Sequence, residues 1–209
     1  MRPWIALILV AGAAALSFRH ALGHRHGIAI PLLLLPALVL GVQEYRFRQD
    51  VGLFSEIATE VAGRPVTMQC QRLTGAMLDA TSELGYVMFD AEGHPADVGR
   101  IERDACNDLR DYLHADKDWP TLDQIIGVAV LSHESNHLAG ELSESRTECS
   151  SIQDLTTVAE ALGATPDQAR HLADRYTTDV YPSMPPEYVS SLCVQDGEWD
   201  ETPGDGVWP

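Results

Sequence analysis

The stretch from residue 122 to residue 138 places the tightest limit on the fold. Its first half, up to Leu131, is apolar on nearly every side of a predicted helix, and such a helix is normally buried. Thr121 follows a Trp-Pro break and is the predicted N-cap, and Gly140 is the predicted C-terminal stop. We therefore expect one central helix with the rest of a domain packed around it.

The second half of this helix carries two histidines. The chain reads His133-Glu134-Ser135-Asn136-His137. Residues i and i+4 lie on one helical face, so both imidazoles can bind one zinc ion. Glu134 is the only charged residue between or beside them, which is typical of a buried helix whose ionic groups face a metal. An incidental pair of core histidines is the alternative.

These five residues resemble the H-E-x-x-H motif of the zincin metallopeptidases, and the resemblance is sharpest over residues 130–149. It implies a zinc ion held by His133 and His137, with Glu134 as the catalytic general base that takes a proton from a zinc-bound water. It also implies a third protein ligand and one open coordination position.

Three glutamates after the motif are candidates for the third ligand: Glu141, Glu144 and Glu148. On a straight helix Glu141 is about 12 Å from His133, too far for both to bind one ion. Glu144 would also be too far away on an uninterrupted helix. It can reach the ion only if the chain reverses near Gly140, a residue type that permits such a turn.

A new helix that begins near residue 143 would carry Glu144 and Glu148 four residues apart on one face. One would bind the metal, and the other would hydrogen-bond a ligand histidine. Residues 144–148 read E-S-R-T-E, which resembles the E-x-x-x-[DE] signature of the gluzincins. This resemblance implies that Glu144 is the metal ligand and that Glu148 hydrogen-bonds a ligand histidine. The alternative is that the two roles are exchanged.

The segment also resembles the metzincin pattern H-E-x-x-H-x-x-G-x-x-H as far as Gly140. Its last histidine is replaced by Ser143, whose neutral hydroxyl is a poor zinc ligand. Met184, which lies in a Pro-rich turn, resembles the methionine beneath a metzincin site, with ordinary packing as the alternative. Candidate donors to a reaction oxyanion, each with a packing role as the alternative, are His171, Tyr181 and Tyr188.

The four cysteines predict two disulfides. Cys70, Cys106, Cys149 and Cys193 are far apart, so they form no C-x-x-C motif. Of the three possible pairings we favour Cys70–Cys106 and Cys149–Cys193, because each closes a local loop. Disulfides indicate a compartment outside the cytosol. Four buried thiols in a cytosolic domain are the alternative.

Two apolar runs, residues 4–18 and 27–42, precede this domain. Each is slightly shorter than the roughly 17–25 residues of a membrane span, and flanking residues could extend both. We favour a two-helix membrane hairpin over a signal peptide ending near residues 13–17 and followed by a single anchor. Arg19 and Arg25 favour a cytoplasmic connection between the runs, and the cysteines favour an extracytoplasmic domain.

Charge is unevenly distributed along the chain. Residues 1–50 hold five Arg and two acidic residues, whereas residues 51–209 hold nine Lys or Arg and 29 Asp or Glu. An acidic domain repels the phosphate backbone, so we expect no nucleic-acid partner.

Together these patterns predict a mainly helical α+β fold. Residues 50–195 are the predicted minimal zincin-like domain, with a small β-sheet packed on the helix that carries the motif. Strands are predicted at 65–70 and 85–89, and an amphipathic helix over 98–114. The flanking segments are a membrane anchor at residues 1–49 and a disordered acidic tail at residues 196–209.

The predicted function is a membrane-tethered zinc metallopeptidase whose partner is a peptide or protein substrate. The predicted location is the cell membrane, with the catalytic domain outside the cytoplasm. One alternative is a membrane-anchored binding or structural module with a degenerate zincin fold. Another is a zinc hydrolase that acts on a different amide.

Overall fold

The computed structural model describes residues 10–12, 14–15, 29–71, 84–204, 206 and 208. The chain divides into two compact units, Met1–Val51 and Gly52–Pro209. Within the described residues, the second unit contains a small sheet, the C-terminal end of a long helix, four further α-helices and both disulfides. The fold is therefore α+β and mainly helical, as predicted.

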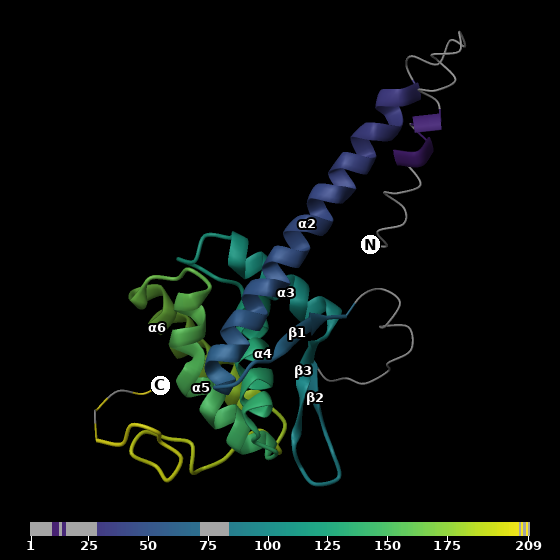
Figure 1. The fold of residues 1–209 in the computed structure, drawn as a ribbon. Helices are drawn as coiled ribbons and strands as arrows, with labels where there is room; N and C mark the ends of the chain where they lie inside the picture. Colours follow the sequence, from purple (N-terminus) through teal and green to yellow (C-terminus); the bar gives the residue numbers. More distant parts are fainter. Residues whose placement is uncertain are drawn as a thin grey trace. The chain divides into compact units, whose positions relative to one another are not determined.

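Helix α2 runs from Ala29 to Ala62 (Figure 1), well beyond the apolar run at residues 27–42. Its continuation is polar, because it includes Glu44, Arg46 and Arg48. Among the helices in the described part of the chain, none combines the length and the hydropathy of a membrane crossing. The structure therefore gives no support to the predicted two-helix membrane hairpin. The first apolar run of that hairpin lies largely outside the described residues.

Three strands form one sheet in the order β1-β3-β2. Strand β3 lies between an antiparallel partner, β2, and a parallel partner, β1. The strands are β1 (Thr67–Cys70), β2 (Gly85–Phe89) and β3 (Pro95–Ile101). Both predicted strands are confirmed, and β3 is an addition.

The predicted helix over residues 98–114 is wrong in its first part. Residues 98–101 belong to β3, where Val98 pairs with Thr67 of β1. Helix α3 begins at Arg103 and ends at His114. Pairing with a strand about 30 residues earlier outweighs the local helical pattern, because strand formation depends on its neighbours more than on intrinsic preference.

Helix α4 (Leu122–Ala139) is the central element, as predicted, and it packs against α3, α5 and β3 (Figure 1). Ile125, Val128 and Leu131 are completely buried on it. Thr121 caps its N-terminus: the Thr121 hydroxyl accepts from the Gln124 backbone N–H, and the Gln124 side chain accepts from the Thr121 backbone N–H. This capping box satisfies two backbone donors that the helix leaves unpaired.

The close approach of α3 to α4 depends on Gly127. A Cβ atom at this position would lie 2.6 Å from the backbone nitrogen of Leu109 and 3.0 Å from its Cα. Any side chain at residue 127 would therefore push the α3 backbone away from α4.

The chain after α4 forms α5 (Glu144–Ala161), α6 (Pro166–Arg175), a π-helical turn η1 (Tyr176–Val180) and a 3₁₀ turn η2 (Tyr181–Ser183). Ser143 caps α5 by accepting from the Arg146 backbone N–H. Helix α5 packs against both α4 and α6.

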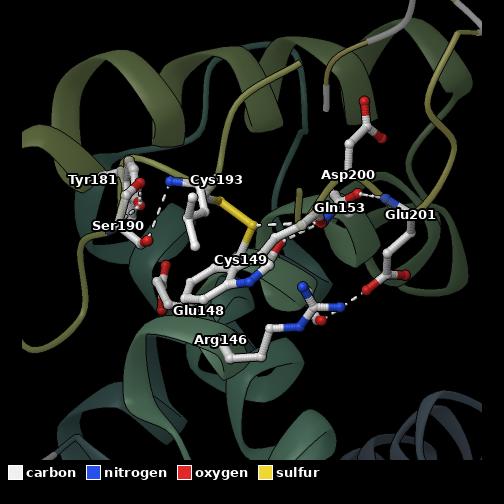
Figure 2. The surroundings of a disulfide bond; sticks show 12 residues. Arg146, Glu148, Cys149, Gln153, Tyr181, Ser190, Cys193, Asp200 and Glu201 are labelled. Atoms are coloured by element: carbon white, nitrogen blue, oxygen red, sulfur yellow. Dashed lines mark hydrogen bonds between the residues drawn. A yellow bond between two sulfur atoms is a disulfide. The ribbon is translucent and has the colours of Figure 1, made fainter. Parts of the chain in front are cut away.

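Both favoured disulfide pairs are confirmed. Cys70–Cys106 joins β1 to α3. Cys149–Cys193 joins α5 to the C-terminal segment (Figure 2). One bond thus ties α3 to the sheet, and the other ties α5 to the C-terminal segment.

The segment predicted to be a disordered tail, residues 196–209, makes hydrogen bonds to α5. The Gln153 side chain on α5 donates to the carbonyl of Trp199 at 2.9 Å and accepts from the backbone N–H of Glu201 at 2.7 Å (Figure 2). The nearby bond at Cys193 holds this segment against α5. Composition alone favours disorder, but it does not reveal this attachment.

Candidate metal centre

The chain reverses direction at Gly140, as the metal hypothesis requires. Gly140 has a φ of 115° in the left-handed region, and its backbone N–H donates to the carbonyls of Asn136 and His137. Helix α4 ends just before it and α5 begins at Glu144. The motif on the last turns of α4 therefore faces the first turns of α5.

Three side chains converge at this reversal. Nε2 of His133 lies 3.0 Å from Nε2 of His137 and 3.1 Å from Oε2 of Glu144. The same carboxylate oxygen is 3.3 Å from Nε2 of His137. Ligands of a tetrahedral zinc ion, each about 2.0–2.2 Å from the metal, lie roughly 3.3 Å from one another. The three groups could therefore hold a metal ion.

The outer nitrogen of each imidazole is hydrogen-bonded. Nδ1 of His133 donates to Oε2 of Glu148 at 2.9 Å, and Nδ1 of His137 donates to the carbonyl of Glu141 at 2.7 Å. With these acceptors at Nδ1, an imidazole that carries a single proton holds it on Nδ1 and presents a lone pair at Nε2. Two lone pairs and the Glu144 carboxylate then face one another, an arrangement that needs a proton or a cation between them.

Tyr176 extends this set of contacts. Its hydroxyl donates to Oε1 of Glu148 at 2.6 Å and lies 3.4 Å from the sulfur of Met184. Glu148 is only 1% exposed, so both of its carboxylate oxygens have partners in the interior. Sequence reasoning missed Tyr176, because it lies 28 residues after Glu148 in no recognisable motif.

Without a metal ion, His133 binds a proton strongly. Burial lowers the pKa of His133, but hydrogen bonds to Glu144 and Glu148, together with the charges of Glu148 and Glu134, raise it to about 10. Hydrogen bonds from His133 and His137 lower the pKa of Glu144 to about 2. Burial, followed by the charge of Glu148, raises the pKa of Tyr176 well above its usual value, so this phenol remains a donor.

Glu134 lies beside the first residue of strand β2. Its side chain is buried, and a Cβ added to Gly85 would come within 2.6 Å of Oε1 of Glu134. Gly85 is the first residue of β2. A larger residue there would displace the Glu134 carboxylate, so the glycine permits the close approach of β2 to the motif.

A cleft of about 580 Å³ opens beside the motif. His133, Glu134, Glu148 and Tyr176 contribute to its lining. Its other lining residues are Leu84, Gly85, Leu122, Ile126, Ala129, Val130, Asp179, Val180, Ser183, Met184, Pro185, Glu187 and Tyr188. The possible metal ligand His133 is thus accessible from a space large enough for a small molecule or a peptide segment.

Of the other site residues suggested by the sequence, two line the cleft and two do not. Tyr188 and Met184 line the cleft, and the Tyr188 ring centroid is 5.7 Å from that of His133. Tyr181 instead accepts a hydrogen bond from the backbone N–H of Ser190 at 3.1 Å (Figure 2). His171 packs edge-on against Trp119, with ring centroids 5.4 Å apart. Neither Tyr181 nor His171 lines the cleft.

Comparison of the chain with protein-family models, with curated proteins and with solved structures gave no match.

Proposed function

We propose that this protein is a zinc-dependent metallopeptidase of the zincin type, gluzincin-like in its third ligand and tethered to a membrane. One observation supports the proposal most strongly. Two imidazole Nε2 atoms and one carboxylate oxygen converge within 3.0–3.3 Å of one another, and one of these groups, His133, lines a cleft. Two histidines and one glutamate are also the protein ligands of a major class of catalytic zinc sites.

In this proposal His133, His137 and Glu144 hold the zinc ion. Glu148 keeps its hydrogen bond to Nδ1 of His133 and so fixes the tautomer and the ring orientation. Only three protein ligands are present in the group, which leaves a coordination position for water or substrate, as catalytic sites require.

Glu134 is the proposed general base. When bound, zinc supplies a Lewis acid that makes water more acidic and a peptide carbonyl more electrophilic. The Glu134 carboxylate lines the cleft beside His133, where it can take the proton that the attacking water loses. It then delivers that proton to the nitrogen of the departing amine. The net reaction is hydrolysis of a peptide bond.

The sheet edge supports a peptide over other amides. Strand β2 has β3 as its only partner among the described strands, and its first residue, Gly85, abuts Glu134. An edge strand offers unpaired backbone groups to an extended peptide, which can bind as an additional strand. Gly85 is the residue of β2 that lines the cleft, so a peptide that pairs with the start of this strand would pass beside the proposed base.

The membrane tether is proposed for residues 1–49. On α2, Leu35 and Leu38 are 66% and 65% exposed, and large apolar side chains of this kind are suited to a lipid environment. The two disulfides favour a domain outside the cytoplasm. Membranes of expressing cells, washed with alkaline carbonate, test the tether: recovery of the full chain in the supernatant would contradict it.

Hydrolysis is tested with the full chain purified in detergent. We expect cleavage of casein or of a mixed peptide library, with loss of activity on adding o-phenanthroline and recovery on adding zinc. Glu134→Gln should retain the metal and lose cleavage by at least 100-fold, as expected for removal of a general base. Glu160→Gln, at the exposed end of α5, is the matched control and should retain full activity.

Two results would contradict the proposal. Undiminished cleavage by Glu134→Gln would remove this residue from the reaction. Stoichiometric zinc with no cleavage of any peptide would favour the alternative of a binding or structural module.

A further inference from the structure

The cleft extends from the metal centre along the N-terminal half of α4. Leu122, which lines it, precedes His133 by 11 residues on the same helix. This separation corresponds to roughly 16 Å of helix axis. An extended peptide rises about 3.3 Å per residue, so this length accommodates four or five residues. We call this part of the cleft the trough.

The trough is walled by apolar side chains from two parts of the chain. Helix α4 and the segment after α6 both contribute. The apolar lining residues are Leu122, Ile126, Ala129 and Val130 on α4, and Val180, Met184, Pro185 and Tyr188 on the later segment. Such walls favour large apolar side chains, because water leaves both surfaces on binding.

The charged groups of the trough are acidic. Asp179 and Glu187 both line it. Asp179 pairs with Nε of Arg175 at 3.3 Å, whereas Glu187 is exposed and has no ion-pair partner within the described residues. No Lys or Arg is among the described residues that line the cleft. Residues 51–209 also carry 29 acidic residues against nine Lys or Arg.

We propose that the substrate is an extended peptide segment with large apolar side chains and at least one lysine or arginine, and that acidic segments are excluded. The inference rests on the metallopeptidase function proposed above. A cleft with charges of one sign raises the local concentration of oppositely charged ligands. The aliphatic part of a lysine or arginine side chain can lie on the apolar wall while its charged end remains near Glu187.

Peptide binding tests this substrate class separately from hydrolysis. The probe is a fluorescent peptide with a central Leu-Leu pair, flanked by lysine, by glutamine or by glutamate. Its anisotropy is measured with full-length, zinc-loaded Glu134→Gln at physiological salt. We expect the lysine peptide to bind at least tenfold more tightly than the glutamate peptide, with the glutamine peptide between them. Replacing Leu-Leu by Ser-Ser should weaken binding at least tenfold.

Glu187→Lys in the same background tests the position of the charge. It should reduce the preference for lysine over glutamate about tenfold or reverse it. Glu160→Lys changes the net charge equally, but its residue lies roughly 18 Å from Glu148 along the α5 axis. This matched control should leave the preference within twofold of the unmodified background.

The outcomes separate the two proposals. Equal binding of the lysine, glutamine and glutamate peptides, or an unchanged preference in Glu187→Lys, overturns the substrate class. Wild-type cleavage with no order among the three peptides also overturns it. Binding in the expected order without wild-type cleavage overturns the hydrolase and supports the substrate class. Binding and cleavage in the same order support both.

Discussion

The hydroxyl of Tyr176 donates to Oε1 of Glu148 at 2.6 Å, while the other oxygen of this carboxylate accepts from Nδ1 of His133 at 2.9 Å. A residue on the π-helical turn η1 thus holds a carboxylate on α5, which in turn holds an imidazole on α4. The orientation of His133 therefore depends on three separate elements.

Tyr176→Phe should weaken zinc binding about tenfold, because removing the support of a ligand histidine costs roughly 10–100-fold in metal affinity. Competition with a chromogenic chelator measures the affinity. Tyr181→Phe is the matched control, because the Tyr181 hydroxyl contacts Ser190 rather than Glu148. Equal affinity of Tyr176→Phe and wild type would show that Glu148 holds His133 without help from the phenol.

Glu144→Gln and Glu148→Gln should differ sharply in zinc affinity. Loss of a direct ligand should weaken binding by more than 100-fold, whereas loss of a supporting carboxylate should stay within about 10–100-fold. Titration of both variants under the same conditions gives the comparison. If Glu148→Gln were the weaker binder, the two glutamates would exchange their proposed roles.

Zinc binding should release protons. With the pKa of His133 raised to about 10, the metal-free site is protonated at pH 8, and the metal must displace that proton. Acidic groups facing His133 are Glu134, Glu144 and Glu148. Because protons compete with zinc, affinity should rise about tenfold per pH unit between pH 7 and pH 9, and then level off near pH 10.

A pH indicator in weak buffer measures this release directly. We expect about one proton per zinc at pH 8, whereas a histidine with the ordinary pKa near 6.5 would release almost none. Glu148→Gln removes one of the causes of the raised pKa, so it should reduce the proton count. Zinc binding without proton release would contradict a protonated His133.

Gly127→Ala should destabilise the protein by about 1–3 kcal/mol, the usual cost of forcing an extra group into a packed interior. The added methyl would meet the backbone of Leu109 at 2.6 Å. Urea unfolding of the full chain measures the change. Gly52→Ala is the matched control, because nothing lies within 4 Å of its added Cβ on α2. That variant should be neutral or more stable by up to about 1 kcal/mol.

Local signals in the sequence were sufficient for the parts of the fold on which the candidate site depends. Helix α4 was predictable because Thr121 caps it, apolar residues fill it and Gly140 ends it. The reversal at Gly140 followed from the short reach of metal ligands, and this reversal brought Glu144 into consideration. The disulfide pairs followed from loop length alone.

Other features depend on partners that lie far away in the sequence. The first part of the predicted helix at 98–114 is a strand because β1 pairs with it. Tyr176 joins the site only after α6 returns the chain to α5. The segment through residue 204 is ordered by Gln153 and by the bond at Cys193. None of these partners is visible in a local pattern, so single-sequence reasoning had no means of finding them.

The Cys149–Cys193 bond closes a covalent ring of chain that contains Tyr176 and Met184. Cys149 directly follows Glu148, so this ring begins and ends beside the proposed metal support. Because both ends of this ring are bonded to α5, its residues cannot move away from α5 as a free segment could. The bond therefore limits how far the part of the cleft wall that holds Tyr176 and Met184 can move away from α5.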